Sequence, residues 1–166
     1  MMISLLTGAA FMFNLAIEPW RAVNDGVMGG ISSGQMSATT EGLLFHGTLS
    51  LENSGGFSSV RRLITEDLSQ SRGMRLTIKG DKRTYQLRFR EDDRFDGLAW
   101  RREFQTDGSV QTIEIEYAEF EAVFRGRVQR GQGSMDPAKI QQVGFLIADK
   151  QPGEFSLEIL GWEVLL

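Results

Sequence analysis

The chain has 166 residues, of which 41% are hydrophobic and 24% are charged, as in a globular domain rather than a disordered or fibrous chain. Its net charge of −4 argues against non-specific nucleic-acid binding by the chain as a whole. It contains no cysteine, which excludes disulfides, thiolate metal sites and cysteine nucleophiles. A length of this order suits a single domain.

The N-terminal segment Met1–Ala16 is largely apolar and superficially resembles a secretion signal. No Lys or Arg precedes Arg21, so the positively charged region that opens such a signal is missing. The run is also too short to span a bilayer. We therefore interpret residues 1–12 as an N-terminal extension or a misplaced start, with a docked strand or a signal peptide as alternatives, and residues 13–166 as one domain. We expect a cytoplasmic protein without stable membrane insertion.

Apolar and polar residues alternate along several segments, as they do in half-buried antiparallel strands. Between Tyr85 and Arg90, for example, every second residue is aromatic or aliphatic and the others are Gln or Arg. The segment Val143–Ala148 is apolar on both faces apart from its glycine, which indicates a central strand. The strands expected from these patterns are residues 43–50, 74–79, 85–90, 113–116, 143–148 and 155–160.

Short glycine-containing breaks separate these segments and predict turns or bulges. Residues 131–137 form a longer expected loop, after which Asp136 caps a single helical turn that has Pro137 at its first position and ends near Gln142. Many short strands with few helices imply an all-β sandwich or barrel. The expected turns are Gly29–Gly30, Gly55–Gly56, Gly80–Asp81 and Asp107–Gly108.

A set of glycine-rich and aromatic segments follows in a fixed order along the chain. They read WRAVNDGVMGGISSG (20–34), FHGTLSLENSGGFSSVR (45–61), IKGDKRTYQLRFR (78–90), FRGR (124–127) and QVGFLIADKQPGEFSLEI (142–159). In this order and at these spacings, the chain resembles the complex I intermediate-associated protein 30 family from about Phe13 to Trp162. The DGVMGG core is the most specific part of this resemblance.

The resemblance implies an antiparallel β-sandwich with the galactose-binding-domain-like jelly roll, a fold shared with many carbohydrate-binding modules. It also implies a protein-binding, assembly-factor-like role, because eukaryotic members of the family assist assembly of respiratory complex I in mitochondria. Some relatives are fused to a nucleotide-binding domain. This sequence has neither such a domain nor an Arg-rich transit peptide, so we expect a bacterial stand-alone member. The family offers no agreed catalytic residues to carry over.

The sequence contains few residues that are candidates for catalysis. His46 is the single histidine, and a Ser–His–Asp triad would need it beside a serine and a carboxylate. It lies in the middle of an expected strand on the more polar face, so we interpret it as a partly exposed strand residue. If the chain were an enzyme, Asp25, Asp81 and His46 would be its acid–base candidates. We expect no enzyme and no cofactor. We also expect no metal site, since no Cys- or His-rich pattern is present and we interpret Glu91–Asp93 as a solvated acidic turn, with a hard-cation site as the alternative.

The segment Asp25–Gly34 is rich in glycine but matches neither phosphate-binding pattern, because no Lys follows and no crossover helix is expected. We interpret Gly29–Gly30 as positions of positive φ or close backbone approach. We expect Asn24 and Asp25 to make an Asx-type turn through their own side chains. Trp20 precedes this loop and is expected to anchor it.

Arginines and aromatic residues gather in the middle of the sequence. Arg88 and Arg90 share one strand face, and Trp100 has charged neighbours on its C-terminal side. Because Arg offers a planar fork that binds anions and stacks on rings, this surface is a candidate for an anionic sugar, a nucleotide or an acidic protein patch. Trp100 is the expected platform, and an ordinary solvated surface of mixed charge is the alternative. The nearby arginines are Arg83, Arg94, Arg101, Arg102, Arg125, Arg127 and Arg130.

The sequence therefore favours a non-catalytic binding module with an unidentified protein partner. A module that binds carbohydrate or another small ligand is the alternative, and nucleic acid is not an expected partner. The candidate binding residues are Trp20, Asn24, Asp25, Asp81, Arg88 and Trp100.

Overall fold

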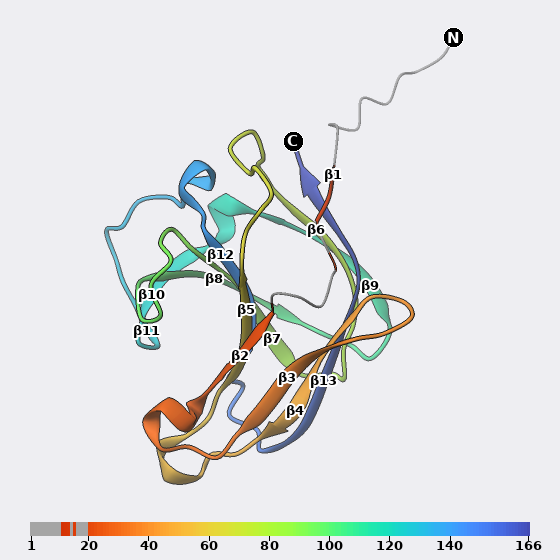
Figure 1. The fold of residues 1–166 in the computed structure, drawn as a ribbon, viewed down its shortest axis with the longest axis vertical. Helices are drawn as coiled ribbons and strands as arrows, with labels where there is room; N and C mark the ends of the chain where they lie inside the picture. The colour runs from red at the N-terminus through yellow and green to blue at the C-terminus, as the bar shows by residue number, and fades with distance from the viewer. Residues whose placement is uncertain (1–10, 14, 16–19) are drawn as a thin grey trace.

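The computed structural model describes residues 11–13, 15 and 20–166. In this part of the chain, regular structure is almost entirely β-strand, arranged as two antiparallel sheets (Figure 1). This arrangement confirms the expected all-β sandwich. Of the expected N-terminal extension, residues 1–10 lie outside the described residues. No helix in the described ranges is long and apolar enough to cross a membrane.

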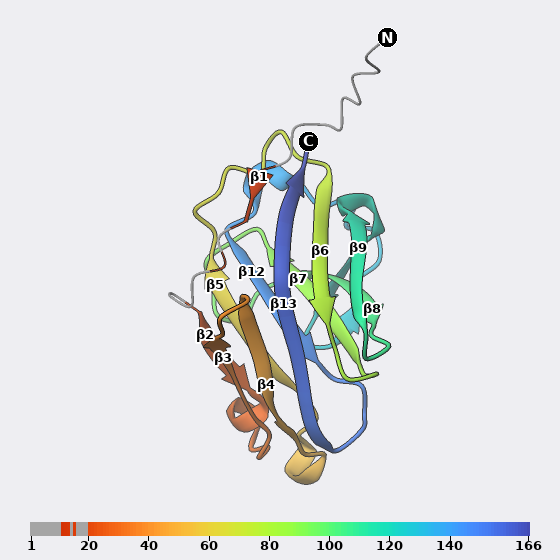
Figure 2. The same ribbon diagram turned by 90° about the vertical axis from the view of Figure 1, so that its right-hand side faces the viewer.

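The first sheet is built around the longest strand, which reaches from one end of the molecule to the other (Figure 2). Its order is β3 (Ser33–Ala38), β4 (Leu43–Leu49), β13 (Gly153–Leu165), β6 (Gly73–Lys79) and β9 (Val110–Glu116), with β1 (Phe11–Met12) also paired to β13. Phe11 lies opposite Val164 and Met12 opposite Glu163. The sheet therefore includes two residues that precede the expected domain start at residue 13.

The second sheet has seven described strands, and its outer face carries the groove described below. Its order is β11 (Arg127–Val128), β10 (Glu121–Phe124), β8 (Ala99–Gln105), β7 (Thr84–Arg90), β12 (Gln142–Ile147), β5 (Ser58–Leu63) and β2 (Arg21–Asn24). All six residues of β12 are buried, which confirms the expected central strand. Inward residues of these strands pack on the first sheet, so the opposite residues form an outer face.

The core lies between the sheets and follows the period of two that the sequence predicts. Tyr85, Leu87 and Phe89 of β7 are fully buried in it. Trp162 of β13 is also fully buried, and its ring stacks on Phe13 at 4.3 Å between centroids. The expectation that Trp162 belongs to the core is therefore confirmed.

Helical structure in the described residues is limited to four short 3-10 turns, of which η4 (Pro137–Lys139) is the one the sequence predicts. The carboxylate of Asp136 accepts a hydrogen bond from the Ala138 amide at 3.0 Å, as expected of a capping residue. The turn is shorter than expected because strand β12 already begins at Gln142. The other turns are η1 (Asp25–Met28), η2 (Glu52–Ser54) and η3 (Tyr117–Glu119).

Candidate functional site

The outer face of the seven-stranded sheet carries a groove of about 610 Å³. Its floor is formed by side chains of β5, β7 and β12 that point away from the core. The edge strands β2 and β10 and the loops beside them form its walls. One wall carries Val23, Met28 and Phe57, and the other carries Phe95 and Val123. A groove of this size is in the range that holds small ligands or peptide segments.

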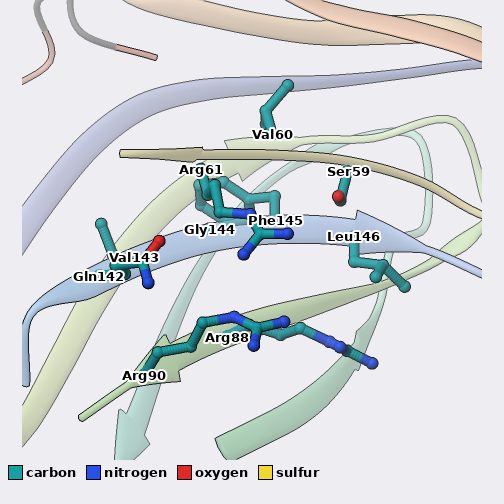
Figure 3. Close-up of a pocket in the computed structure, with 10 residues that line it drawn as sticks. All are labelled: Ser59, Val60, Arg61, Arg88, Arg90, Gln142, Val143, Gly144, Phe145 and Leu146. Atoms are coloured by element: carbon teal, nitrogen blue, oxygen red, sulfur yellow. The ribbon is translucent and has the colours of Figure 1, made fainter. Parts of the chain in front are cut away.

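Three arginines meet on the floor of this groove. Strand pairing places Arg61 of β5 and Arg88 of β7 on either side of Gly144 in β12. Arg90 follows two residues along β7 on the same face. A small hollow of about 30 Å³ lies over Gly144, with Arg61 on one side of β12 and Arg88 and Arg90 on the other (Figure 3), and the same three arginines also line the groove. The glycine contributes no side chain, so the hollow stays open between the guanidinium groups. We call Arg61, Arg88 and Arg90 the arginine cluster.

The arginine cluster is hydrogen-bonded to neutral groups. Arg61 Nη1 donates to the carbonyl of Phe95 at 2.8 Å, and Arg90 Nη1 donates to the carbonyl of Gly97 at 2.7 Å. Arg88 Nε donates to Gln86 Oε1 at 2.9 Å. None of the three forms an ion pair with a carboxylate of the described residues. Three like charges therefore share one face without a direct counter-ion.

The environment lowers the pKa of these arginines. Burial and the charges of Arg90, Arg101 and Arg61 lower the pKa of Arg88 to about 9. Burial and the charges of Arg90 and Arg21 lower the pKa of Arg61 to about 10, against the opposing effect of Asp96. Both values lie above neutral pH, so the groups stay charged and the hollow is positive. Bringing an anion into it would offset the repulsion between them.

Most of the remaining arginines of the expected surface differ from the cluster because they are paired with carboxylates. Arg83 is buried with Asp149, and four of the others contact carboxylates on their own or adjoining strands and loops. Isolated surface pairs of this kind contribute little to stability and leave no free charge for a ligand. The pairs include Arg94–Asp92, Arg101–Glu121, Arg102–Glu119 and Arg125–Asp96. Arg127 and Arg130 are exposed and form no ion pair with the described carboxylates, but only in the arginine cluster do three unpaired arginines of the described residues line one hollow.

Asp25 joins two glycine-rich loops instead of facing the groove. Its carboxylate is fully buried and accepts hydrogen bonds from the Ser32 amide (2.9 Å), the Ser32 hydroxyl (2.6 Å) and the Gly56 amide (2.7 Å). The Phe57 amide donates to the same carboxylate at 3.3 Å. Burial raises the pKa of Asp25, but these hydrogen bonds outweigh it and hold the pKa below its ordinary value. We call this arrangement the Asp25 latch.

The glycines of the two loops are explained by the latch. A Cβ on Gly30 would lie 2.4 Å from the Asp25 Cγ, and one on Gly55 would lie 2.6 Å from Asp25 Oδ2. Asn24 lies beside the latch, where its Oδ1 accepts a hydrogen bond from the Ser58 hydroxyl at 2.6 Å. The expected local Asx turn is wrong for both residues, because their side chains bond to residues 7 or more positions away. Both support the loops that border the groove.

Asp81 is likewise engaged in holding a turn. Its Oδ1 accepts hydrogen bonds from the Arg83 amide (3.2 Å) and the Tyr85 hydroxyl (3.0 Å), and its Oδ2 accepts from the Ser156 amide (2.8 Å). Nearby, Arg83 makes two hydrogen bonds to the Asp149 carboxylate, of 2.9 and 2.6 Å. Asp81 therefore connects the β6–β7 turn to β13, away from the groove.

The expectation that Trp100 stands at the surface is wrong. Its side chain is only 4% exposed and belongs to the core, because strand pairing sets Trp100 opposite Phe89 and Ala122 on the inward face. Trp20 is half-buried and packs near Phe145, 6.2 Å between ring centroids, so it contacts the core. Neither ring lines the groove. Of the expected candidates, Arg88 alone lies there.

The three acid–base candidates do not converge. The imidazole Nε2 of His46 lies 2.9 Å from the Ser37 hydroxyl on the neighbouring strand of the first sheet, and it is half-exposed as expected. The carboxylates of Asp25 and Asp81 bond to other partners, none of which they share with His46. Within the described residues, no group of three or more potential metal ligands is close enough to hold an ion.

Sequence patterns missed several groove residues. Arg61 lies in a strand that reads SSVRRL and lacks clean alternation, since Arg62 occupies an inward position at its end. Phe95 lies in a loop and Met28 in the turn η1. Outside strands, the alternation of apolar and polar residues does not indicate which side chains face the groove. The available signal was Gly144 in the middle of a central strand, because an interior glycine often marks close approach by another group.

Known proteins of one family are similar to this chain over most of its length. A family model described as complex I intermediate-associated protein 30 matches residues 10–159. The chain belongs to the complex I intermediate-associated protein 30 family. The mouse protein "Complex I intermediate-associated protein 30, mitochondrial" is 28% identical to this chain over an alignment 166 positions long. The alignment covers 86% of this chain and 51% of the mouse protein. The chain thus spans about half the length of this curated relative. A cytoplasmic location and a bacterial source stay predictions.

Solved structures with the same fold include carbohydrate-binding modules. The family 11 module of a cellulosomal cellulase from Clostridium thermocellum superposes with a TM-score of 0.70 at 17% identity, covering 95% of both chains. The module from that organism in complex with a mixed-linked β-1,3-1,4 tetrasaccharide gives 0.66 at 16% identity, covering 94% of this chain and 95% of that one. At such identities the likeness concerns the fold alone, and it confirms the expected jelly roll of this family member.

Proposed function

We propose that this member of the complex I intermediate-associated protein 30 family is a non-catalytic binding module that holds a protein partner in the outer groove of its seven-stranded sheet. The observation that carries the proposal is the groove of about 610 Å³, with a charged floor between apolar walls. Protein interfaces combine apolar anchors with arginine in this way. The family relationship supports an assembly role, with an intermediate of complex I as the partner.

The Asp25 latch supports a binding role for the groove because it fixes one of the walls. Met28 is 60% exposed and is the last residue of η1, the turn that begins at the latch residue Asp25. Because the latch fixes the backbone that carries Met28, less backbone freedom is lost when a partner binds at this wall. Phe95 on the opposite wall is 51% exposed, with the Arg61 guanidinium 5.0 Å from its ring centroid.

A sugar ligand is the second candidate, and the shared fold of the carbohydrate-binding modules is what favours it. The groove chemistry supports it less. Sugar rings bind on exposed aromatic platforms, but the three tryptophans of this chain pack against the core. Sugar hydroxyls also need acceptors, whereas arginine side chains only donate hydrogen bonds. Phe95 is the one aromatic ring that the second wall presents to a ligand.

A pair of matched substitutions tests the proposal. Met28 and Ile31 are both exposed apolar residues of the same loop region, but Met28 lines the groove and Ile31 is not among its lining residues. The Met28→Glu chain should recover at least fivefold less of a specific partner from cells of its source than wild type, whereas Ile31→Glu should recover as much as wild type. Quantitative mass spectrometry after chemical crosslinking measures both.

Equal recovery by the two variants, or no specific partner under several conditions, would count against a protein-binding groove. A thermal-shift screen with neutral and acidic oligosaccharides covers the second candidate, because a bound ligand raises the melting temperature by mass action. A sugar that stabilises wild type but not Met28→Glu would replace the protein partner as the ligand of the groove.

A further inference from the structure

The arginine cluster has a property that an ordinary sheet surface lacks. Its three arginines line one hollow and form no ion pair with a described carboxylate, whereas arginines such as Arg101 and Arg125 are paired with Glu121 and Asp96. Asp92, Asp96 and Glu103 lie near enough to influence the cluster, but none is ion-paired with it. Positive charge that converges without a direct counter-ion favours an anionic group from outside the chain.

Gly144 gives the hollow its shape. It occupies the middle of the central strand β12, where a side chain on this face would fill the space between Arg61 and Arg88. The hollow of about 30 Å³ exceeds the roughly 10–15 Å³ that a cavity needs to hold one water molecule, so it has room for a small oxygen-bearing group. An oxygen placed there meets planar forks on both sides, which is the geometry that arginine offers to carboxylates.

Gln142 adds a second polar feature at the edge of the same hollow. Its side-chain nitrogen donates to the carbonyls of Asp92 (2.9 Å) and Arg94 (3.0 Å). Its Oε1 is buried and accepts no hydrogen bond within the described residues. A ligand that fits must therefore bring a donor as well as an anion, and a peptide brings both through its backbone N–H groups and its acidic side chains.

The groove has the length of a short extended peptide. It crosses the sheet from β2 to β10, and the strand order places β5, β12, β7 and β8 between them. Strands lie about 4.8 Å apart, so the groove extends over roughly 24 Å. An extended chain rises about 3.3 Å per residue, so this length takes roughly seven residues. The exposed apolar residues Met28 and Phe95 on the two walls suit aliphatic side chains toward its two ends.

We propose that the groove recognises an extended acidic peptide segment, one of whose carboxylates enters the hollow over Gly144 and binds Arg61, Arg88 and Arg90. This inference rests on the proposed function and names the chemistry of the partner. Apolar residues on either side of the acidic residue contact the walls. The peptide backbone donates to Gln142 Oε1.

The test uses a fluorescein-labelled seven-residue peptide that alternates Glu and Leu, and the same peptide with Gln in place of Glu. Fluorescence anisotropy of the intact chain should detect binding of the Glu peptide with at least tenfold higher affinity than the Gln peptide. Arg88→Met should weaken binding of the Glu peptide at least tenfold, and Arg88→Lys should restore part of the affinity because it keeps the charge but not the fork. Arg72→Met, which removes a charge paired with Glu116 on the other sheet, is the control and should bind like wild type.

Folding is monitored alongside by thermal unfolding, because Arg88 donates only to the Gln86 side chain and its replacement should not lower the melting temperature. Equal affinity for the Glu and Gln peptides, or unchanged affinity in Arg88→Met, would overturn the proposal. So would tight binding of inorganic phosphate or an oligogalacturonate without binding of the Glu peptide. If the Glu peptide fails while Met28→Glu still loses the cellular partner, the acidic peptide is wrong and the protein-binding groove stands.

Discussion

The Asp25 latch and the arginine cluster are both made of charges withdrawn from water on the same side of the molecule, yet their surroundings differ. The carboxylate of Asp25 accepts hydrogen bonds from Ser32, Gly56 and Phe57, which hold its pKa below the ordinary value. In the cluster, burial and like charges lower the pKa of Arg88 to about 9. A charge whose partners lie within the chain supports the fold, whereas a group of charges without counter-ions favours a ligand.

Arg83 and Arg88 show the same difference between a charge with a partner in the chain and a charge without a counter-ion. Arg83 is bound to Asp149 and to three backbone carbonyls, and hydrogen bonding to Asp149 raises its pKa against the effect of burial. Arg88 has one neutral partner. Both residues lie in or beside strand β7, so local sequence does not separate them. Their partners come from distant parts of the chain.

The largest effect should come from Arg83→Met. The side chains of Arg83 and Asp149 are 9% and 6% exposed, and removing one partner of a buried pair leaves the other charged and unsolvated. We expect a loss of about 4 kcal/mol in the free energy of unfolding, measured by urea denaturation. Arg72→Met, which breaks the exposed pair with Glu116, should cost less than about 1 kcal/mol. Similar losses in the two variants would mean that burial of the pair does not set its contribution.

Asp25→Asn should lower the free energy of unfolding by about 3 kcal/mol. The carboxylate now accepts hydrogen bonds from backbone N–H groups, and the new amide nitrogen would be a donor facing those donors. Glu52→Gln, an exposed change in the adjoining loop, is the control and should leave the free energy of unfolding within about 0.5 kcal/mol.

The pH dependence of Asp25→Asn sharpens this prediction. The folded pKa of Asp25 lies below its unfolded value, so its contribution is fully present above the unfolded pKa of about 3.9 and is lost as pH falls through the folded pKa. The difference in stability between wild type and Asp25→Asn should therefore shrink as pH is lowered from 5 toward 2. A difference that stays constant across this range would contradict the account of the latch as a deprotonated carboxylate.

The strands were predictable from sequence to the extent that one face of each is buried. Alternation located β7 and β13, and the continuous apolar run located β12. In β8, the charged neighbours of Trp100 suggested exposure, although Phe104, four residues on, shares its inward face. Pairing across strands decides such cases, and a single sequence does not contain it.

The candidate site was predictable only in part, for the same reason. Arg88 follows from alternation, but Arg61 reaches the cluster through the pairing of β5 with β12. Asp25 lies in a glycine-rich segment whose composition is typical of a binding loop. Its role as a latch depends on backbone amides about 30 residues further along the chain. Sequence reasoning therefore found charged residues without showing which of them have partners.

Gly30→Ala should cost about 2 kcal/mol, because the new Cβ would lie 2.4 Å from the Asp25 Cγ and displace the latch carboxylate. Gly26→Ala in the same motif is the matched control. A Cβ at that position meets no atom within 4 Å, so the change should be neutral or slightly stabilising. Differential scanning calorimetry of both variants checks this. Equal losses would mean that the glycines serve chain flexibility and not the close approach of Asp25.

The smallest effect, and the one of opposite sign, should come from Arg88→Met. Removing one of three like charges reduces repulsion within the cluster, so the free energy of unfolding should rise by up to about 1 kcal/mol at low ionic strength. The gain should shrink in 1 M salt, where the Debye length falls to about 3 Å. Arg101→Met, which removes an arginine paired with Glu121, should instead be neutral or mildly destabilising. If Arg88→Met destabilised the chain as Arg83→Met does, the cluster would be part of the structural framework, and the contrast between charges that hold the fold and charges that await a partner would fail.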